Sequence, residues 1–223
     1  FTISQALKII KLNIFSYICY IREMKRILCF GDSNTYGYNP HNGNRYDKNT
    51  RWTGVLQKLA GENYEIVEAG GNNRTAFSDN PDGIQFTGYK LLPEYLKENY
   101  ETIILAIGIN DLQIFYNPAI EEFENGIRFF VSIAAEQARG SNLILLSPSH
   151  INENILKSNF RFLFDEISIE KSKKITPIYE KIAKEYNCKL LDLNKLVNTS
   201  KIDGLHYEAE EHKKIAESVI KLI

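Results

Sequence analysis

Short, uninterrupted apolar runs alternate with longer stretches of helical spacing from residue 24 to the end of the chain. A continuous apolar run predicts a strand buried on both faces, and such runs occupy 26–30, 64–69, 102–107, 143–146 and 189–193. Apolar residues three and four positions apart predict amphipathic helices over 52–60, 88–99, 118–138, 169–186 and 207–222. Strands that alternate with helices are typical of α/β domains. We therefore expect a single doubly wound, flavodoxin-like domain, a three-layer sandwich around a five-stranded parallel sheet.

Two prolines and two irregular stretches modify this pattern. Pro118 falls at the start of a predicted helix, where its missing N–H costs nothing, whereas Pro177 falls inside the helix predicted over 169–186 and should kink it. Residues 38–50 and 147–168 follow neither the helical nor the strand pattern. Loops of that length usually cover a site or build a subunit interface, so we expect both stretches to narrow the pocket, to build an interface, or both.

Composition narrows the classes of protein that the chain can represent. The 223 residues are 43% hydrophobic and 25% charged, which is typical of a soluble globular domain and excludes a disordered or collagen-like chain. The formal net charge is only −1, so no basic excess points to a nucleic acid or to an anionic membrane surface. We expect neither as a partner.

Residues 1–23 stand apart from the repeating pattern. The single methionine, Met24, comes directly before the first predicted strand. The longest uncharged run of the segment spans ten residues, half of what a transmembrane helix needs, and lysines interrupt the apolar stretch that a signal peptide would have. We interpret 1–23 as an extension, non-native or translated from upstream, and 24–223 as the domain; the alternatives are an amphipathic helix that docks on the domain or on a partner, and a retained signal or anchor.

The cysteines indicate the compartment. Cys19, Cys29 and Cys188 are odd in number and far apart, and the last two lie in or beside strand-like apolar runs, where thiols behave as small hydrophobes. A disulfide framework is therefore not expected. We predict a cytoplasmic protein.

Polar residues with chemical uses follow the predicted strands. Gly31-Asp32-Ser33 follows the first strand, a Gly/Asn-rich turn over 70–75 follows the second, and Asn110 follows the third. The motif Asp203-x-x-His206 comes just before the last helix. Since ligands of open parallel sheets bind beyond the carboxyl ends of the strands, we expect these groups to face one site.

Each of these groups has a use in acyl transfer. A serine hydroxyl needs an adjacent base, and His206 could take the proton of Ser33 while Asp203 bonds the other ring nitrogen. The developing oxyanion needs preorganised donors, which the backbone N–H groups of Ser33 and of the Asn72–Asn73 turn and the amide of Asn110 could supply. Any one of these pieces alone is a common turn or cap, so the hypothesis depends on their joint placement.

The four blocks resemble those of the SGNH, or GDSL-type, hydrolases, which are named for a Ser, a Gly, an Asn and a His. The block order matches, and Tyr46, the run RWTGVL over 51–56 and NRT over 73–75 are similar to the bacterial arylesterase/acyltransferase branch. The resemblance covers residues 25–223. It implies a serine esterase in which Ser33 is the nucleophile, His206 the base, Asp203 its orienting partner, and Ser33, Asn73 and Asn110 the oxyanion hole.

The chain departs from this branch in places. Asn73 stands where the branch has a small residue, and Tyr36 where it often has Trp. Further residues at the strand ends are expected to line the pocket: Asp32, Tyr36, Gly71, Asn72 and His150.

The remaining histidines and two arginines are expected to lie outside the reaction. His150 is the rival base, but it has no carboxylate at comparable spacing. His41 and His212 are interpreted as surface residues, and Arg51 and Arg74 as structural ion-pair residues.

No metal and no nucleotide cofactor is predicted, because the chain has neither clustered ligands nor a phosphate-binding glycine motif. We expect a small-molecule ester as the substrate, hydrolysed as a short-chain aryl or acetyl ester. Two alternatives are a carbohydrate O-acetylesterase with the same triad and a non-catalytic flavodoxin-like domain that binds an anion or nucleotide. The resemblance further implies a homo-oligomer.

A chain that starts at Met24 tests the interpretation of the first segment. We expect it to hydrolyse p-nitrophenyl acetate at the rate of the full chain, because every predicted site residue lies beyond position 24. The measurement is kcat for both chains. Loss of activity in the shortened chain would show that residues 1–23 complete the domain.

Overall fold

Five parallel strands form the centre of the computed structural model, which describes residues 24–223; the predictions for 1–23 lie outside the described residues. The strands are β1 (Lys25–Gly31), β2 (Tyr64–Gly70), β3 (Thr102–Ala106), β4 (Asn142–Ser147) and β5 (Lys189–Asp192). Their order in the sheet is β2-β1-β3-β4-β5. This is the doubly wound order of a flavodoxin-like domain, so the predicted fold class is confirmed.

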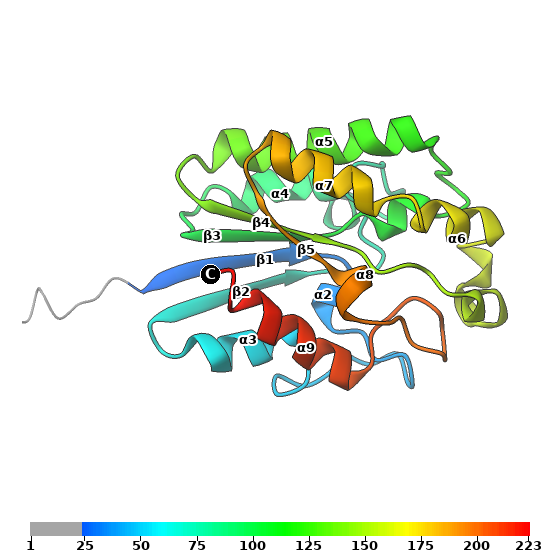
Figure 1. Ribbon diagram of the computed structural model, residues 1–223, viewed down its shortest axis with the longest axis horizontal. Helices are drawn as coiled ribbons and strands as arrows, with labels where there is room; N and C mark the ends of the chain where they lie inside the picture. The colour runs from blue at the N-terminus through cyan, green and yellow to red at the C-terminus, as the bar shows by residue number, and fades with distance from the viewer. Residues whose placement is uncertain (1–23) are drawn as a thin grey trace, which may run out of the picture.

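The central strands are buried on both faces, which explains their uninterrupted apolar runs. Along β1, Leu28 and Phe30 pack into one hydrophobic core, while Ile27 and Cys29 pack into the core on the opposite face. Figure 1 shows the two layers of helices that make this possible, one above and one below the sheet. Because successive side chains of a strand point to opposite faces, a strand between two cores has no position for a polar residue.

Helices cover both faces of the sheet. On the side of Leu28 and Phe30 lie α4 (Gly88–Tyr95), α5 (Ile120–Gln137), α6 (Glu166–Ser172) and α7 (Thr176–Glu185). On the other side lie α3 (Trp52–Ala60), α8 (Leu193–Leu196) and α9 (Ala209–Val219), as Figure 1 shows. No helix within 24–223 combines the length and the apolar character that a membrane span requires.

The structure corrects the helix predicted over 169–186. Two helices, α6 and α7, take its place, and Pro177 lies in the first turn of α7 rather than inside a kinked helix. The first turn is where proline fits best, since the N–H that it lacks would have no intrahelical partner. The helices predicted over 88–99, 118–138 and 207–222 are each shorter at their ends than expected.

The strand order brings the ends of β1 and β3 together at the switch point of the sheet. The chain passes from β1 to β2 at one side and then crosses to β3 at the other side of β1. All five strands point the same way, so their carboxyl ends share one edge of the sheet, at the right of Figure 1. Ligands of this fold bind at that edge.

Both irregular stretches of the sequence lie at this edge. Residues 38–50 form a loop that Arg51 and Arg45 tie to β2 through Glu68, with Arg51 Nε 2.6 Å and Arg45 Nη2 2.5 Å from the carboxylate. Burial opposes ionisation of Glu68, but the two arginines outweigh it and lower its pKa. Arg51 is thus a structural ion-pair residue, as predicted. Residues 147–168 contain the short 3-10 helices η3 (Glu153–Lys157) and η4 (Asn159–Phe162).

His212 contradicts its predicted place on the surface, whereas His41 is exposed as expected and contacts Glu208. The His212 side chain is completely buried between α9 and α3, where Trp52 N–H donates to Nδ1 over 3.3 Å. Burial lowers the pKa of His212 to about 3, and nearby His206 acts in the same direction. The polar residues next to His212 in sequence belong to the more exposed face of α9, whereas His212 itself lies on the buried face with Ile215.

The pH dependence of stability tests this placement. Between about pH 6.5 and 3 the unfolded chain binds a proton at residue 212 that the folded chain excludes, so stability falls as the pH falls, by about 1.4 kcal/mol per pH unit at most. His212→Gln keeps an acceptor for Trp52 N–H and removes the titration. We expect urea unfolding at pH 7 and 4.5 to show a loss about 2 kcal/mol larger in the parent than in the variant. Equal losses would contradict the buried, neutral imidazole. Other titrating groups, such as Asp32, are common to both proteins and cancel in the comparison.

Candidate active site

Ser33 lies at the first turn after β1, where the chain leaves the sheet for the short helix α2 (Ser33–Tyr36). Asp32 caps this helix: its Oδ1 accepts from Asn34 N–H over 2.9 Å. Gly37 ends it in the left-handed conformation, with φ of 88°. The turn is thus fixed at both ends, and Ser33 is held nearly buried at the carboxyl edge of the sheet.

Ser33, His206 and Asp203 form a continuous chain of hydrogen bonds. Ser33 Oγ lies 2.9 Å from His206 Nε2, and His206 Nδ1 lies 2.7 Å from Asp203 Oδ2. The second oxygen, Asp203 Oδ1, accepts from the backbone N–H groups of Leu205 and His206. Although Ser33 and His206 are 173 positions apart, the structure brings all three predicted residues together.

Asp203 remains ionised in this setting. Its burial opposes ionisation, but hydrogen bonds from the ring and backbone N–H of His206 and from Leu205 N–H outweigh burial and lower the Asp203 pKa. The imidazole itself is held by aromatic rings, since Tyr38 stacks on it at 4.1 Å between centroids and Phe160 packs at 5.1 Å. A carboxylate that binds Nδ1–H leaves Nε2 free to accept a proton from Ser33.

Three residues that line the pocket beside Ser33 Oγ have an N–H group to spare. The backbone N–H groups of Ser33 and Asn73 have no hydrogen-bond partner in residues 24–223, and Asn73 adopts a left-handed φ of 57°, which asparagine tolerates. Asn110 Nδ2 uses one of its hydrogens on the carbonyl of Arg74, at 3.1 Å, and keeps the other. Asn73 and Asn110 both line the same pocket as Ser33, so the predicted donor set is brought together as well.

Arg74 holds the turns that carry these donors. Its buried guanidinium donates to the carbonyls of Gly31, Ala69 and Gln85 at 2.5–2.9 Å and lies 4.8 Å from the ring of Phe30. The prediction of an ion pair is therefore wrong: Arg74 is structural, but its acceptors are carbonyls. Which carbonyls the guanidinium reaches depends on how the chain turns after β1 and β2, which only the folded sheet reveals.

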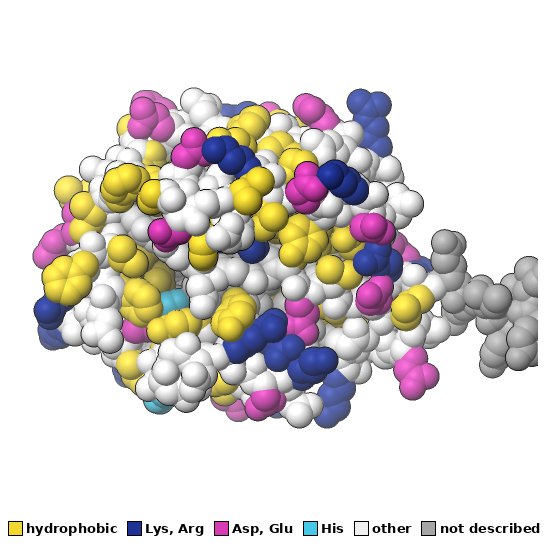
Figure 2. Space-filling view, turned by 180° about the vertical axis from the view of Figure 1, so that it is seen from behind, with side chains coloured by type: hydrophobic (Ala, Val, Ile, Leu, Met, Phe, Trp, Pro, Cys, Tyr) yellow, Lys and Arg dark blue, Asp and Glu magenta, His cyan; other side chains and the backbone are white. Residues whose placement is uncertain are grey.

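The pocket in front of Ser33 is small and mainly apolar. It has a volume of about 100 Å³, and its lining residues are Ser33, Tyr38, Asn72, Asn73, Asn110, Phe160, Leu163, Phe164, Leu205 and His206. No motif in the sequence marked its apolar wall. Tyr38, Phe160, Leu163 and Phe164 come from the two irregular stretches, so the length of those stretches was the available signal. Figure 2 shows hydrophobic side chains gathered round a hollow at the left of the view.

Of the five residues predicted to line the pocket beyond the triad and donors, only Asn72 does so. Tyr36 packs under the guanidinium of Arg45, at 4.7 Å, and the carbonyl of His150 accepts from Thr199. Gly71 donates its N–H to the Gly31 carbonyl. A Cβ at position 71 would lie 2.4 Å from the Arg74 guanidinium, so glycine at this position leaves the space that Arg74 occupies. Within residues 24–223, the histidine that bonds Ser33 Oγ is His206 and not His150, and burial lowers the pKa of His150.

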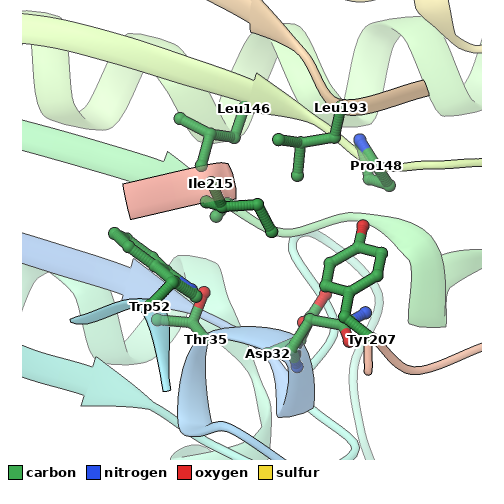
Figure 3. A pocket seen from close by; sticks show the side chains of 10 residues that line it. Asp32, Thr35, Trp52, Leu146, Pro148, Leu193, Tyr207 and Ile215 are labelled. Atoms are coloured by element: carbon green, nitrogen blue, oxygen red, sulfur yellow. Dashed lines mark hydrogen bonds between the residues drawn. The ribbon is translucent and has the colours of Figure 1, made fainter. Parts of the chain in front are cut away.

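Asp32 lies behind the nucleophile turn. It faces a second, internal cavity of about 20 Å³ together with Thr35, Trp52 and Tyr207, which Figure 3 shows. Such a volume holds one water molecule and no substrate. Burial raises the pKa of Asp32 to about 7. As predicted, its contact is with the backbone of its own turn.

The chemistry available to this arrangement follows from its groups. No cluster of three or more His, Cys, Asp or Glu side chains with the spacing of a metal site occurs in residues 24–223. What the pocket holds is a hydroxyl bonded to an oriented imidazole, with three N–H donors beside it. That combination suits attack on a carbonyl carbon and stabilisation of the resulting oxyanion.

Comparisons with known proteins agree with this geometry. Residues 27–219 match the family described as GDSL-like lipase/acylhydrolase, whereas no curated protein matches the chain. A carbohydrate acetylesterase family member from Sinorhizobium meliloti superposes with a TM-score of 0.81 at 27% identity, over 89% of this chain and 97% of that one. Est24, a carbohydrate acetylesterase from Sinorhizobium meliloti, and the aryl esterase of M. smegmatis have the same TM-score and coverage at 24% identity.

Replacing Arg74 tests its role in holding the site. Arg74→Met removes three hydrogen bonds from a charged donor, to the carbonyls of Gly31, Ala69 and Gln85, and each such bond contributes about 1.5–3 kcal/mol. We expect urea unfolding to show a loss of about 3 kcal/mol or more. The matched control is Arg128→Met, which breaks part-exposed ion pairs on the surface of α5 and should cost less than about 1 kcal/mol. Equal losses would contradict a special role for Arg74.

Proposed function

Because the chain belongs to the GDSL-like lipase/acylhydrolase family, we propose that it is a serine esterase that hydrolyses short-chain carboxylic esters through an acyl-enzyme on Ser33. The observation that carries the proposal is the bonded series from Ser33 through His206 to Asp203, with three N–H donors in the same pocket. The roles of these residues are inferred from their contacts.

The first half of the reaction forms the acyl-enzyme. His206 Nε2 takes the proton of Ser33 as Oγ attacks the ester carbonyl carbon, and Asp203 stabilises the imidazolium that results. The carbonyl oxygen becomes an oxyanion and accepts from the N–H groups of Ser33 and Asn73 and from Asn110 Nδ2. As the tetrahedral intermediate collapses, the C–O bond of the ester breaks and the alcohol leaves with the proton from His206.

The second half releases the acid. A water molecule bonded to His206 Nε2 gives up a proton and attacks the acyl carbon, and the same three donors hold the second oxyanion. The bond between the acyl carbon and Ser33 Oγ then breaks, and the imidazolium returns its proton to Ser33. The burial of His206 and the stacked Tyr38 ring keep the proton path short.

The shape of the pocket favours a small acyl group and an apolar alcohol. Its volume of about 100 Å³ and its wall of Phe160, Phe164 and Leu205 suit an acetyl or propionyl group. Outside it, Phe115 and Phe162 are each 74% exposed, and Leu163 belongs both to this exposed group and to the pocket. Ile114 N–H donates to the Leu163 carbonyl, so Phe115 and Phe162 lie in the segments next to a lining residue, and exposed aromatic side chains there favour aryl esters as substrates.

A second candidate keeps the mechanism and changes the alcohol to a sugar. Two of the similar structures carry the name carbohydrate acetylesterase, and an acetyl group would fill the same small pocket. Acetate release from acetylated xylan compared with p-nitrophenyl acetate separates the two. The non-catalytic, anion-binding alternative leaves the bond between Asp203 and His206 without a use.

Substitution of the triad tests the proposal. We expect Ser33→Ala and His206→Ala each to lower kcat on p-nitrophenyl acetate by at least about 10³-fold, because each removes a group that makes or breaks a bond. Mass spectrometry should find one organophosphate adduct, on Ser33, in the parent protein.

The matched control for the histidine is His150→Ala, which should keep most of the activity. Ester hydrolysis at the parent rate in Ser33→Ala would overturn the proposed function. An equal loss of kcat in His150→Ala and His206→Ala would contradict the assignment of His206, rather than His150, as the base. Tight binding of FMN or phosphate without labelling of Ser33 would favour the binding domain.

A further inference from the structure

Gln113 connects two of the proposed oxyanion donors, and nothing in the sequence patterns singled it out. Its side chain is 4% exposed, just after the 3-10 helix η2 (Ile109–Leu112) that carries Asn110. Gln113 Nε2 lies 2.7 Å from Asn73 Oδ1 and 3.1 Å from Asn110 Oδ1. One amide nitrogen has two hydrogens, so a single side chain satisfies both acceptors.

The orientation of the Asn110 amide depends on this contact. The carbonyl of Arg74 can only accept, so the group of Asn110 that faces it must be Nδ2, and Oδ1 must then point to Gln113. With both ends of the amide bonded, the remaining hydrogen of Nδ2 has one direction. Rotation of the amide by half a turn would put an acceptor where the oxyanion forms.

Asn73 is held in the same way. Its left-handed backbone is less favourable for a residue with a Cβ, and two contacts hold it there: Asn80 Nδ2 donates to the Asn73 carbonyl over 2.9 Å, and Gln113 Nε2 donates to Oδ1. The Asn73 N–H lies between these two anchors. If the side chain is released, the peptide that carries the second donor is fixed at one point only.

The segment that carries Gln113 is itself anchored to the turn after β2. Asp111 is completely buried and accepts from the backbone N–H groups of Ala76, Phe77 and Ser78. Gln113 N–H donates to the Asn110 carbonyl, and the Gln113 carbonyl accepts from Asn117 N–H. The amide of Gln113 is therefore presented from rigid backbone, which a positioning contact requires.

We propose that Gln113 is a positioning residue that holds Asn73 and Asn110 in the orientation needed to bind the oxyanion. The proposal rests on the proposed esterase function. Gln113 does not line the pocket, so it acts through the two asparagines. An oxyanion donor stabilises the transition state more than the bound ester, so the loss of its alignment lowers kcat and leaves KM almost unchanged.

Gln113→Leu and Gln113→Glu test the proposal together. Leucine removes both donated hydrogens at similar volume. Glutamate keeps the shape of the side chain but places a carboxylate oxygen, which can only accept, against the Oδ1 atoms of Asn73 and Asn110. We expect kcat on p-nitrophenyl acetate, per Ser33 titrated with an organophosphate, to fall about 10- to 100-fold in each variant, with KM changed less than about threefold. For Gln113→Glu, kcat relative to the parent should rise as the pH falls, because a protonated carboxyl regains one donor. A structural defect would show no such pH dependence.

Gln57→Leu is the matched control. Gln57 in α3 makes three hydrogen bonds away from the pocket: Nε2 donates to the carbonyls of Gly61, at the end of α3, and Tyr64 in β2, and Oε1 accepts from Ile66 N–H in β2. Its loss should lower stability without changing kcat per titrated site.

Two results separate this inference from the proposed function. If Ser33→Ala is inactive while both Gln113 variants keep kcat within twofold of the parent, or raise only KM, the positioning role is overturned and the esterase remains. If Ser33→Ala keeps its activity, the proposed function fails first. Should Gln113→Leu not fold, Gln113→Glu alone decides, because its shape is that of the parent side chain.

Discussion

The rest of the site depends on the contacts of one buried residue, Arg74. Its guanidinium binds the carbonyl of Gly31 at the end of β1 and that of Ala69 near the end of β2, and its own carbonyl accepts from Asn110 after β3. Three strand ends are thereby joined at one point. Because buried peptide carbonyls need hydrogen-bond donors, a side chain with several N–H groups stabilises these turns in a buried position.

Burying the charged side chains of Arg74 and Asp111 costs free energy, and hydrogen bonds to the backbone offset that cost. Burial lowers the pKa of Arg74 and raises that of Asp111 to about 6, yet each makes three hydrogen bonds to backbone. Removing one of these hydrogen bonds would leave a buried charge or a buried backbone group unpaired, which costs more free energy than the burial itself. The contacts therefore favour one conformation of the turns. The donors beside Ser33 are then in place before a substrate arrives, which is the condition for electrostatic stabilisation of a transition state.

Patterning predicted the strands better than the ends of the helices. A strand such as β3 is buried on both faces, so its run of apolar letters has one interpretation. Helix ends depend on where the chain turns. The apolar spacing is similar on both sides of the break between α6 and α7, so periodicity did not predict that a new helix begins just before Pro177. His212 was misplaced for a related reason, since its neighbours in sequence lie on the opposite face of α9.

By itself, the sequence determined the α/β class, the positions of the five strands and the groups that follow them, because these are local properties of short runs. The chain of contacts from Ser33 to Asp203 matched that expectation. Only the tertiary structure decided what surrounds them: the carbonyls that Arg74 binds, the apolar wall from residues 38 and 160–164, and the link from Gln113 to Asn73 and Asn110. Those contacts join residues far apart in the chain, and no periodicity encodes a contact between two loops.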